Sequence, residues 1–312
     1  MSNRSHRNPA HRMLNRMRRE GLKHSSERAS TMPATTYHCV LASTDCLKLL
    51  GRLPDRSVQL VVCDPPYNLD IAAWDRRTDY VEWALAWLGQ CQRVLAPSGN
   101  LVLFGGLQYQ GAGGGDLQEL MYAIRHQLEL RLVNLIIWHY RNGMSAHRFF
   151  ANRHEEIAWY ARTRRYTFNL DAVRIPYSTE VERAYLRDPR LNAETVKKGK
   201  NPTNVWEIPR LGGNALERVG HPTQKPAALI ERLVRALSNP GDVVLDFFAG
   251  SGVTAVVAER CGRHSIAADR DAALPDYLEQ LRARLAPEDV APREPCESPE
   301  ALFARLQSAA RA

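Results

Sequence analysis

Short apolar runs with the length of buried strands alternate with amphipathic helical patterns along most of this chain. The clearest run, residues 59–64, ends on an acid followed by two prolines, as a buried parallel strand ends at its carboxyl edge. Further strands are expected at 38–42, 100–106, 132–138, 242–248 and 264–269. Helices are expected at 45–50, 80–95 (closed by Pro97 and Gly99), from 116, 226–237 and 253–261. This alternation predicts an α/β fold with a mostly parallel, doubly wound sheet.

Three segments depart from that alternation. Residues 141–220 contain isolated prolines, many charges and weak periodicity, which predicts an inserted subdomain, although 155–161 could still be a strand of the sheet. Residues 1–36 are predicted to be a basic, partly disordered N-terminal arm. Residues 286–312 are predicted to be a loose C-terminal tail with one helix at 299–310, which leaves 37–285 as the main domain.

A net positive charge is confined to two of these segments. The net charge is +8, and residues 1–30 and 141–220 each contribute +6, so the rest of the chain is acidic. A polyanion contacted through both segments is the expected partner, because neutralising phosphates releases their counterions. The alternative is a solubilising basic tail and a solvated loop.

Several classes of protein are excluded by the same sequence. Apolar runs such as Leu135–Trp138 are far below the roughly 20 residues that span a bilayer, so no membrane segment is expected. The Arg-rich N-terminus has no apolar core of a secretory signal. The six cysteines form no Cys-x-x-Cys pair, which argues against a disulfide framework and a structural zinc site, and no metal ligands are predicted.

A glycine turn follows the strand expected at 242–248. Gly250 and Gly252 would let the backbone approach a ligand at a helix N-terminus. No Lys follows, and the third glycine of the dinucleotide fingerprint is missing, which excludes a Walker loop and disfavours NAD. Asp269 ends the next strand, where a ribose-binding carboxylate would lie. A nucleoside cofactor without a pyrophosphate is favoured over the alternative of a simple tight turn.

The second loop of interest, Asp64-Pro65-Pro66-Tyr67-Asn68, directly follows the strand at 59–64. Its prolines stiffen the chain, so the Asp64 carboxylate, a proline carbonyl and the Tyr67 ring are held in fixed relation. A carboxylate and a carbonyl accept hydrogen bonds from a planar amine, while the tyrosine can stack on the ring that carries it. The loop therefore predicts a site for an amino-substituted nucleobase.

These two loops resemble the target-amine and cofactor motifs of the S-adenosylmethionine-dependent amino methyltransferases of DNA. The amine motif precedes the cofactor motif, with a basic segment between them, which is the order of the β class. Ser43 to Cys46 is similar to the family's cofactor-adenine segment, 95–101 to its helix-to-strand connection, and 221–226 to its methionine-side motif. His154-Glu155-Glu156, with Tyr166 and Asn169, resembles the segment before target recognition. The resemblance spans residues 36–285, and Phe247 departs from the family's usual proline.

The resemblance implies a Rossmann-like methyltransferase fold with a circularly permuted motif order and a DNA-recognition insertion within 141–220. It implies S-adenosylmethionine as the cofactor. The residues expected to bind it are Asp45, Cys46, Asp64, His221, Pro222, Thr223, Gln224, Lys225, Asp246, Phe247, Phe248, Ala249, Gly250, Ser251, Gly252, Asp269 and Arg270. The expected catalytic residues are Asp64, Pro65, Pro66 and Tyr67.

The activity implied is methylation of adenine N6 in double-stranded DNA, with the base flipped out of the helix, by the modification enzyme of a restriction system. Two alternatives stay open: cytosine-N4 methylation, for which the family more commonly has Ser in place of Asp64, and a non-catalytic DNA-binding protein of the same fold. The resemblance also implies a bacterial cytoplasmic protein that associates with the nucleoid through DNA. A homodimer and a cognate endonuclease without stable contact complete the expected partners.

Some of these residues also allow plainer structural roles. His221 and Lys225 could cap the helix that follows them, and Asp45 could be both a helix N-cap and an adenine ligand. Trp83 and Trp87 are expected to pack in the core rather than to form a stacking platform. The glycines at 113–115 could form a loop that closes over DNA or a plain surface connection.

Overall fold

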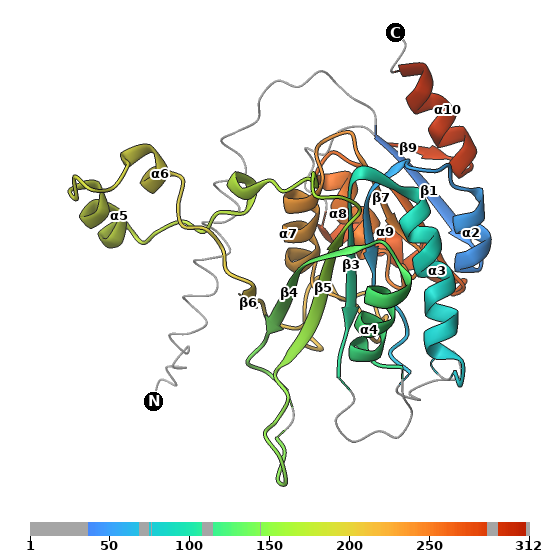
Figure 1. Ribbon diagram of the computed structural model, residues 1–312, viewed down its shortest axis with the longest axis horizontal. Helices are drawn as coiled ribbons and strands as arrows, with labels where there is room; N and C mark the ends of the chain where they lie inside the picture. Colours follow the sequence, from blue (N-terminus) through green and yellow to red (C-terminus); the bar gives the residue numbers. More distant parts are fainter. Residues whose placement is uncertain are drawn as a thin grey trace, which may run out of the picture. The chain divides into compact units, whose positions relative to one another are not determined.

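The computed structural model describes residues 37–68, 75, 77–107, 115–143, 145–285 and 293–309 (Figure 1). The predicted arm at 1–36 lies outside the described residues, as do Gly113 and Gly114 of the glycine-rich loop. Within the described ranges, no helix combines the length and the apolar character needed to cross a membrane.

The strands of the described residues form one nine-stranded sheet, in the order β6-β4-β5-β3-β2-β7-β8-β1-β9. Their bounds are β1 Tyr37–Ser43, β2 Val58–Cys63, β3 Leu95–Gly105, β4 Arg131–His139, β5 His154–Ala161, β6 Val205–Glu207, β7 Val243–Asp246, β8 His264–Asp269 and β9 Arg293–Cys296. Of these strands only β5 runs antiparallel to its neighbours, β3 and β4. The mostly parallel sheet predicted from the alternation is confirmed.

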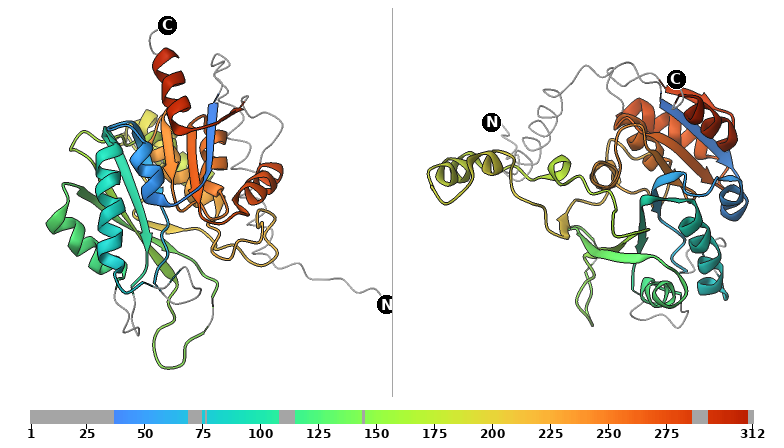
Figure 2. Two further views of the ribbon diagram at one scale, coloured as in Figure 1. Left: turned by 90° about the vertical axis from the view of Figure 1, so that its right-hand side faces the viewer. Right: turned by 45° about the horizontal axis from the view of Figure 1, so that its top comes forward.

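Helices cover both faces of the sheet (Figures 1 and 2). Their bounds are α2 Cys46–Arg52, α3 Tyr80–Val94, α4 Leu117–Gln127, α5 Thr179–Leu186, α6 Ala193–Lys197, α7 Ala227–Leu237, α8 Val253–Arg260, α9 Leu274–Leu285 and α10 Pro299–Ala309. One core cluster joins the sheet to α2, α3, α4 and α10, and the other joins it to α7, α8 and α9. Along β2, Val61 and Cys63 belong to the first cluster, and Leu60 and Val62 to the second. Every residue of β2 is buried, which explains its continuous apolar run.

The neighbouring strands β2 and β7 lead to opposite faces of the sheet. The chain leaves β2 for α3 on the first face and leaves β7 for α8 on the second. The two loops therefore diverge and leave a crevice at the carboxyl ends of these strands, the usual ligand site of an open α/β sheet. The amine-motif loop follows β2 and the glycine turn follows β7, so the fold brings both predicted motifs to this crevice.

Three boundaries differ from the sequence prediction. Strand β3 begins at Leu95 rather than at Asn100, because Pro97 and Gly99 lie in a bulge: Val58 pairs with Leu95, but Leu60 pairs with Asn100. Strand β7 ends at Asp246, before the two phenylalanines. The helix predicted at 299–310 is confirmed as α10, but the tail is not loose over residues 293–309: β9 pairs with β1, and Leu302 and Phe303 of α10 are buried in the first core cluster.

The segment at 141–220 both joins the sheet and leaves it. Its strands β5 and β6 pair with β4, so the suggested strand at 155–161 is confirmed. Its helices α5 and α6 contact each other and project to the left of the sheet in Figure 1. No residue of α5 is buried, whereas α6 buries Val196. The result is an exposed helical projection attached to an otherwise continuous sheet.

Candidate active site

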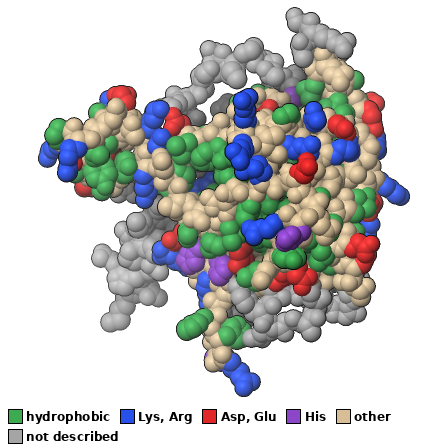
Figure 3. All heavy atoms as spheres, viewed as in Figure 1, with side chains coloured by type: hydrophobic (Ala, Val, Ile, Leu, Met, Phe, Trp, Pro, Cys, Tyr) green, Lys and Arg blue, Asp and Glu red, His purple; other side chains and the backbone are tan. Residues whose placement is uncertain are grey.

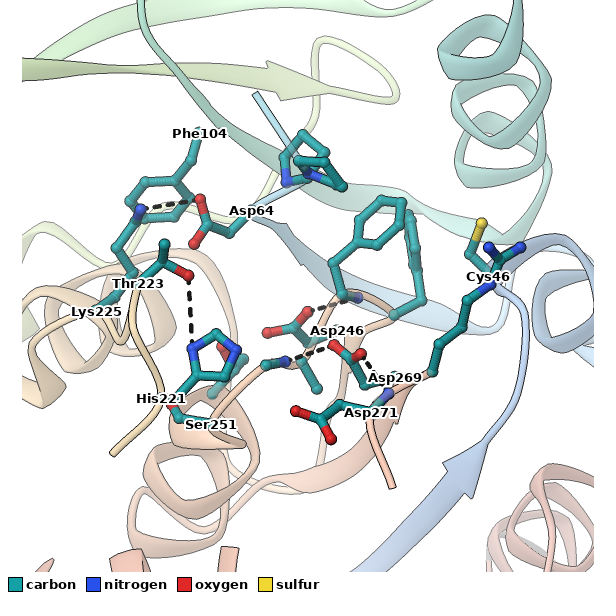
Figure 4. Close-up of a pocket in the computed structure, with 18 of the residues that line it drawn as sticks. Cys46, Asp64, Phe104, His221, Thr223, Lys225, Asp246, Ser251, Asp269 and Asp271 are labelled. Atoms are coloured by element: carbon teal, nitrogen blue, oxygen red, sulfur yellow. Dashed lines mark hydrogen bonds and ion pairs between the residues drawn. The ribbon is translucent and has the colours of Figure 1, made fainter. Parts of the chain in front are cut away.

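A cavity of about 500 Å³ lies at the carboxyl ends of β2, β7 and β8. All of the sequence-predicted site residues except Gly252 line it. Figure 4 shows part of this lining, with Asp64 and Lys225 on one side and Asp246 and Asp269 facing the cavity. Gly252 instead begins α8 with φ +78°, and a Cβ there would lie 3.1 Å from the Leu278 side chain. Its role in the structure is to turn the chain tightly against α9.

Asp246 and Asp269 organise the turn after β7. Asp246 is buried and accepts a hydrogen bond from the Phe248 backbone N–H at 3.1 Å, and burial raises the pKa of its carboxyl to about 7. Asp269 accepts hydrogen bonds from the backbone N–H groups of Gly250, at 2.8 Å, and Asp271, at 2.9 Å. Gly250 has φ +50°, and a Cβ there would lie 2.9 Å from the His221 ring. The turn is thus fixed before any ligand binds.

The α2 end of the cavity carries a carboxylate beside an arginine. Asp45 caps α2 by accepting a hydrogen bond from the Leu47 backbone N–H at 2.9 Å, and it forms an ion pair with Arg270. Partial burial raises the pKa of the Asp45 carboxyl, but the Arg270 and Leu47 contacts outweigh it, and the pKa is lowered overall. The predicted N-cap is confirmed. Asp45 also lines the cavity, as an adenine ligand would.

Aromatic rings form one wall of the cavity. Phe248 and Trp83 both line it, with ring centroids 5.7 Å apart. Phe247, 1% exposed, packs against the fully buried Trp87 with centroids 5.6 Å apart. The phenylalanine that replaces the family's usual proline therefore fills the core between the turn and α3. The prediction that both tryptophans are core residues is confirmed for Trp87, whereas Trp83 is half-buried and borders the cavity.

The loop after β2 is held by its own side chains. The Tyr80 hydroxyl donates to the Pro66 carbonyl at 2.6 Å. Asn68, at φ +57°, donates to the Arg77 carbonyl at 3.0 Å and accepts from the Arg77 backbone N–H at 2.8 Å. Pro65 is buried. These contacts add to the stiffness of the two prolines, so Asp64 and Tyr67 project from a fixed support.

Asp64 belongs to a cluster of four polar side chains: Asp64, Tyr67, Glu155 and Lys225. The Tyr67 hydroxyl donates to Asp64 Oδ1 at 2.8 Å, and Lys225 Nζ lies 3.0 Å from the same oxygen. Lys225 Nζ also lies 3.2 Å from Glu155 Oε2 and donates to the Tyr67 hydroxyl oxygen at 3.1 Å. The side chain of Lys225 is 10% exposed, and those of Asp64 and Glu155 are each 19% exposed. This is a nearly buried ion-pair cluster at the carboxyl end of β2.

The cluster shifts the protonation of its cation and of its phenol. Burial lowers the pKa of the Lys225 amine, but Asp64 and Glu155 outweigh this effect, and the pKa is raised overall. Burial, together with the Asp64 and Glu155 charges, raises the pKa of the Tyr67 hydroxyl well above its usual value. Lys225 is therefore a cation and Tyr67 a neutral donor at neutral pH.

The segment before α7 supplies the rest of the lining. The N-cap of the helix is Pro226, and the Ala227 backbone N–H donates to the Glu217 carboxylate at 3.1 Å, so the alternative that His221 or Lys225 caps it is wrong. Burial lowers the pKa of the His221 imidazole, against the opposing charge of Asp269. Gln224 ties its own loop, since its amide accepts from the Val219 backbone N–H at 2.9 Å and donates to the Glu217 carbonyl at 2.7 Å.

The structure adds site residues that the sequence prediction did not include. Phe104 and Asp271 line the cavity, and Glu155 reaches Lys225 from β5. Glu155 lies 70 positions before its partner, and no local pattern pairs them. Asp271, two residues after the predicted ribose carboxylate, could have been found as a second acid at the same strand end. Asn169 of the resembling segment instead donates to the Ser238 carbonyl at 2.8 Å, after the end of α7.

Comparisons with known proteins agree with this geometry. The family model described as DNA methylase, for N6 and N4 methyltransferases, matches residues 58–280. The type II methyltransferase M.BglII from Bacillus subtilis is 35% identical over 76% of this chain and 67% of its own length. The type II methyltransferase M.HpaI from Haemophilus parainfluenzae is 33% identical over 78% of this chain and 73% of its own length.

Solved structures show the same fold. The PvuII DNA methyltransferase, which is cytosine-N4-specific, has a TM-score of 0.61 at 21% identity, covering 87% of this chain and 93% of its own. TTHA0409 from Thermus thermophilus, solved in complex with S-adenosyl-L-methionine, has a TM-score of 0.54 at 25% identity, covering 84% of this chain and 98% of its own. With its carboxylate loop and glycine turn meeting at one crevice, the chain belongs to the N6/N4 DNA methylase family and is a DNA methyltransferase.

Proposed function

We propose that this protein methylates the N6 amine of adenine in duplex DNA, as the modification enzyme of a type II restriction system. S-adenosylmethionine is the cofactor. The observation that carries the choice of adenine is Asp64: a carboxylate stands where the family more commonly has Ser for the cytosine-N4 product, and its Oδ1 already accepts from two donors.

The chemistry assigns a simple task to the amine-motif loop. When bound, the cofactor supplies an activated methyl group on its sulfonium, so the protein has to bring the amine to it. Asp64 and the Pro65 carbonyl accept the amine hydrogens and draw the nitrogen lone pair toward the methyl group, while Tyr67 stacks on the base. Because the amine is paired and stacked inside a duplex, the adenine has to be flipped out to reach this crevice. Positioning and charge supply most of the rate enhancement.

The cofactor would occupy the cavity between the two loops. The Asp246 to Ser251 turn and Asp269 face it from β7 and β8, and Asp45 faces it from the start of α2. Carboxylates and aromatic rings together line the cavity, and this combination suits a nucleoside with an amino acid attached. Its volume of about 500 Å³ falls within the range typical of small-molecule sites.

Duplex DNA would meet the basic segment at 141–220. The loop between β4 and β5 exposes Arg148, Phe149 and Phe150, and Phe150 is fully exposed. Figure 3 shows basic and apolar side chains together on this loop, at the bottom of the view, and on the projection of α5 and α6. The loop leaves from the carboxyl end of β4 and returns at the amino end of β5, close to Glu155 of the cluster. Positive charge therefore borders the mouth of the site.

We propose the DNA recognition sequence from a further resemblance. The length and the Arg-rich N-terminus resemble those of the RsrI modification methyltransferase, which implies GAATTC as the target. On the same basis we propose a cytoplasmic enzyme of a bacterium that reaches the nucleoid through DNA, acts beside an endonuclease without stable contact, and forms a homodimer.

Replacing Asp64 tests the proposed role most simply. Asp64→Ala should abolish methyl transfer while the affinity for S-adenosylmethionine stays within a few-fold of the wild type, because the carboxylate acts on the amine. Asp55→Ala is the matched control, since Asp55 is an exposed carboxylate that pairs with Arg93 on the surface. Transfer of labelled methyl groups and calorimetric cofactor binding give the two readouts. Substantial remaining transfer by Asp64→Ala would contradict the role given to this residue.

A further inference from the structure

Lys225 occupies the position that a target amine requires. Its ammonium donates to Asp64 Oδ1, and it lies 5.2 Å from the centroid of the Tyr67 ring and 5.3 Å from that of Phe104. A carboxylate acceptor beside aromatic rings is also what a flat ring with an amino group needs. The Lys225 ammonium therefore contacts the same carboxylate and aromatic rings that would bind the base.

Burial explains why Asp64 needs such a partner before DNA binds. Removing a charge from water costs free energy, and a close ion pair offsets that cost. Asp64 is 19% exposed, so its carboxylate would destabilise the protein without a cation beside it. Three N–H donors of Lys225 face three acceptors, namely Asp64 Oδ1, Glu155 Oε2 and the Tyr67 hydroxyl oxygen, at 3.0, 3.2 and 3.1 Å. The cluster is therefore satisfied without a base.

A second carboxylate, Glu155, allows the target amine to replace Lys225 on Asp64. When an amine takes the place of Lys225 on Asp64, the ammonium keeps Glu155 as an ion-pair partner and does not become a lone buried cation. We propose that Lys225 is a positioning residue that stands in for the target amine on Asp64, and that Glu155 retains Lys225 when the flipped base displaces it. This inference rests on the proposed function, and it gives Lys225 a different role from that of a cofactor ligand.

The two residues should have opposite effects on recognition of the amine. Without Lys225, Asp64 keeps the neutral Tyr67 hydroxyl but has no cation of the cluster beside it, so it gains more from the amine of an entering base and the preference for such a base increases. Without the Glu155 charge, Asp64 is the one carboxylate of the cluster left to Lys225, so the lysine is harder to displace and the preference decreases. Opposite signs from two neighbouring residues are not expected of a general structural defect.

The test compares two duplexes containing the mapped site, one with adenine and one with purine, which lacks the 6-amino group, at the target position. Binding is measured at equilibrium with S-adenosylhomocysteine, which has no methyl group to transfer. The ratio of the two dissociation constants should be about tenfold larger for Lys225→Met than for the wild type, equivalent to about 1.4 kcal/mol. It should be smaller than the wild-type ratio for Glu155→Gln, which is nearly isosteric and keeps the proposal testable if Lys225→Met does not fold.

Lys48→Met is the matched control, because it removes an exposed lysine of α2 outside the cluster and should leave the ratio unchanged. Affinity for S-adenosylhomocysteine should stay the same in all three variants. A ratio that is unchanged in both cluster variants would overturn the proposal. A tenfold loss of cofactor affinity in Lys225→Met, without a change in the ratio, would assign the lysine to the cofactor.

Failure of the proposed function gives a different result. The wild-type enzyme is first shown to methylate adenine in the unmodified duplex. If the label falls on cytosine, the adenine assignment has failed, and the same variants are compared with cytosine and 2-pyrimidinone, which lacks the 4-amino group. A wild-type protein that labels neither base refutes both proposals.

Discussion

Replacing Asp246 by Asn should change how the stability of this protein depends on pH. The carboxyl is 4% exposed, and burial raises its pKa to about 7. The reference value is 3.8, and each unit corresponds to about 1.36 kcal/mol, so ionising this group in the folded protein costs up to about 4 kcal/mol. Asn keeps the shape and an oxygen that can accept from the Phe248 backbone N–H, but it carries no charge.

Proton linkage determines whether stability rises or falls with pH. Between about pH 4 and pH 7 the folded protein holds a proton on Asp246 that the unfolded chain has lost, so this group makes the protein less stable as the pH rises. His264 acts in the opposite direction, because burial and the nearby His38 lower its pKa to about 4, and it makes the protein more stable as the pH rises to its unfolded value of 6.5. The His264 contribution is common to both proteins and cancels in their difference.

Urea unfolding of the wild type and Asp246→Asn at pH 5 and pH 8 measures this difference. At pH 5 Asp246→Asn should already be more stable by about 1.6 kcal/mol, because residue 246 of the wild type is protonated when folded but ionised when unfolded. At pH 8 Asp246→Asn should be more stable by a few kcal/mol. Asp55→Asn, an exposed control, should show no such trend. An identical difference at both pH values would refute the argument that the buried carboxyl is ionised at a cost.

Two further perturbations test the cofactor turn and the basic arm. Gly250→Ala should lower the affinity for S-adenosylmethionine by tenfold or more, because φ is +50° and the new Cβ would lie 2.9 Å from the His221 ring. Gly51→Ala, where nothing lies within 4 Å, is its control, and calorimetry that finds equal affinities for both variants would contradict the close approach. Deleting residues 1–36 should weaken DNA binding and reduce the slope of log affinity against log salt, because fewer phosphates are neutralised. A salt slope equal to that of the full chain would show that the arm makes no phosphate contacts.

The parallel core could be predicted because its signals are local. Strand β2 is buried along its whole length, and its apolar run ends at the carboxyl edge where Asp64 begins the loop. The turn after β7 needs a positive φ at Gly250 and Gly252, and the sequence supplies glycine at both positions. Residues that act within a few positions of one another leave a pattern that can be read from one chain.

Strand β9 could not be predicted, because its signal is weak and its partner is distant. It is four residues long, contains Pro295 and two charged residues, and lies at the edge of the sheet, where it pairs with β1 alone among the described strands. Proline is tolerated at such an edge because one side of the strand needs no hydrogen-bond donor. A short edge strand therefore has the composition of a loop.

The cluster at Asp64 shows the corresponding limit for the site. Asp64 and Lys225 could each be named from their motifs, but their contact joins positions 161 residues apart. Glu155 acquires its role only because β5 is inserted antiparallel beside β3, which brings its first residues to the carboxyl ends of the parallel strands. Ion pairs of this kind depend on sheet order, which no local pattern of residues records.

Methylation of adenine N6 is tested by identifying the base that the protein methylates. The full chain is incubated with methyl-labelled S-adenosylmethionine and unmethylated bacterial genomic DNA, and the DNA is digested to nucleosides and separated. The label should appear in N6-methyladenine. Label in N4-methylcytosine would contradict the proposed substrate while leaving the fold and the family intact, and no label from a protein that binds the cofactor would contradict the proposed catalysis.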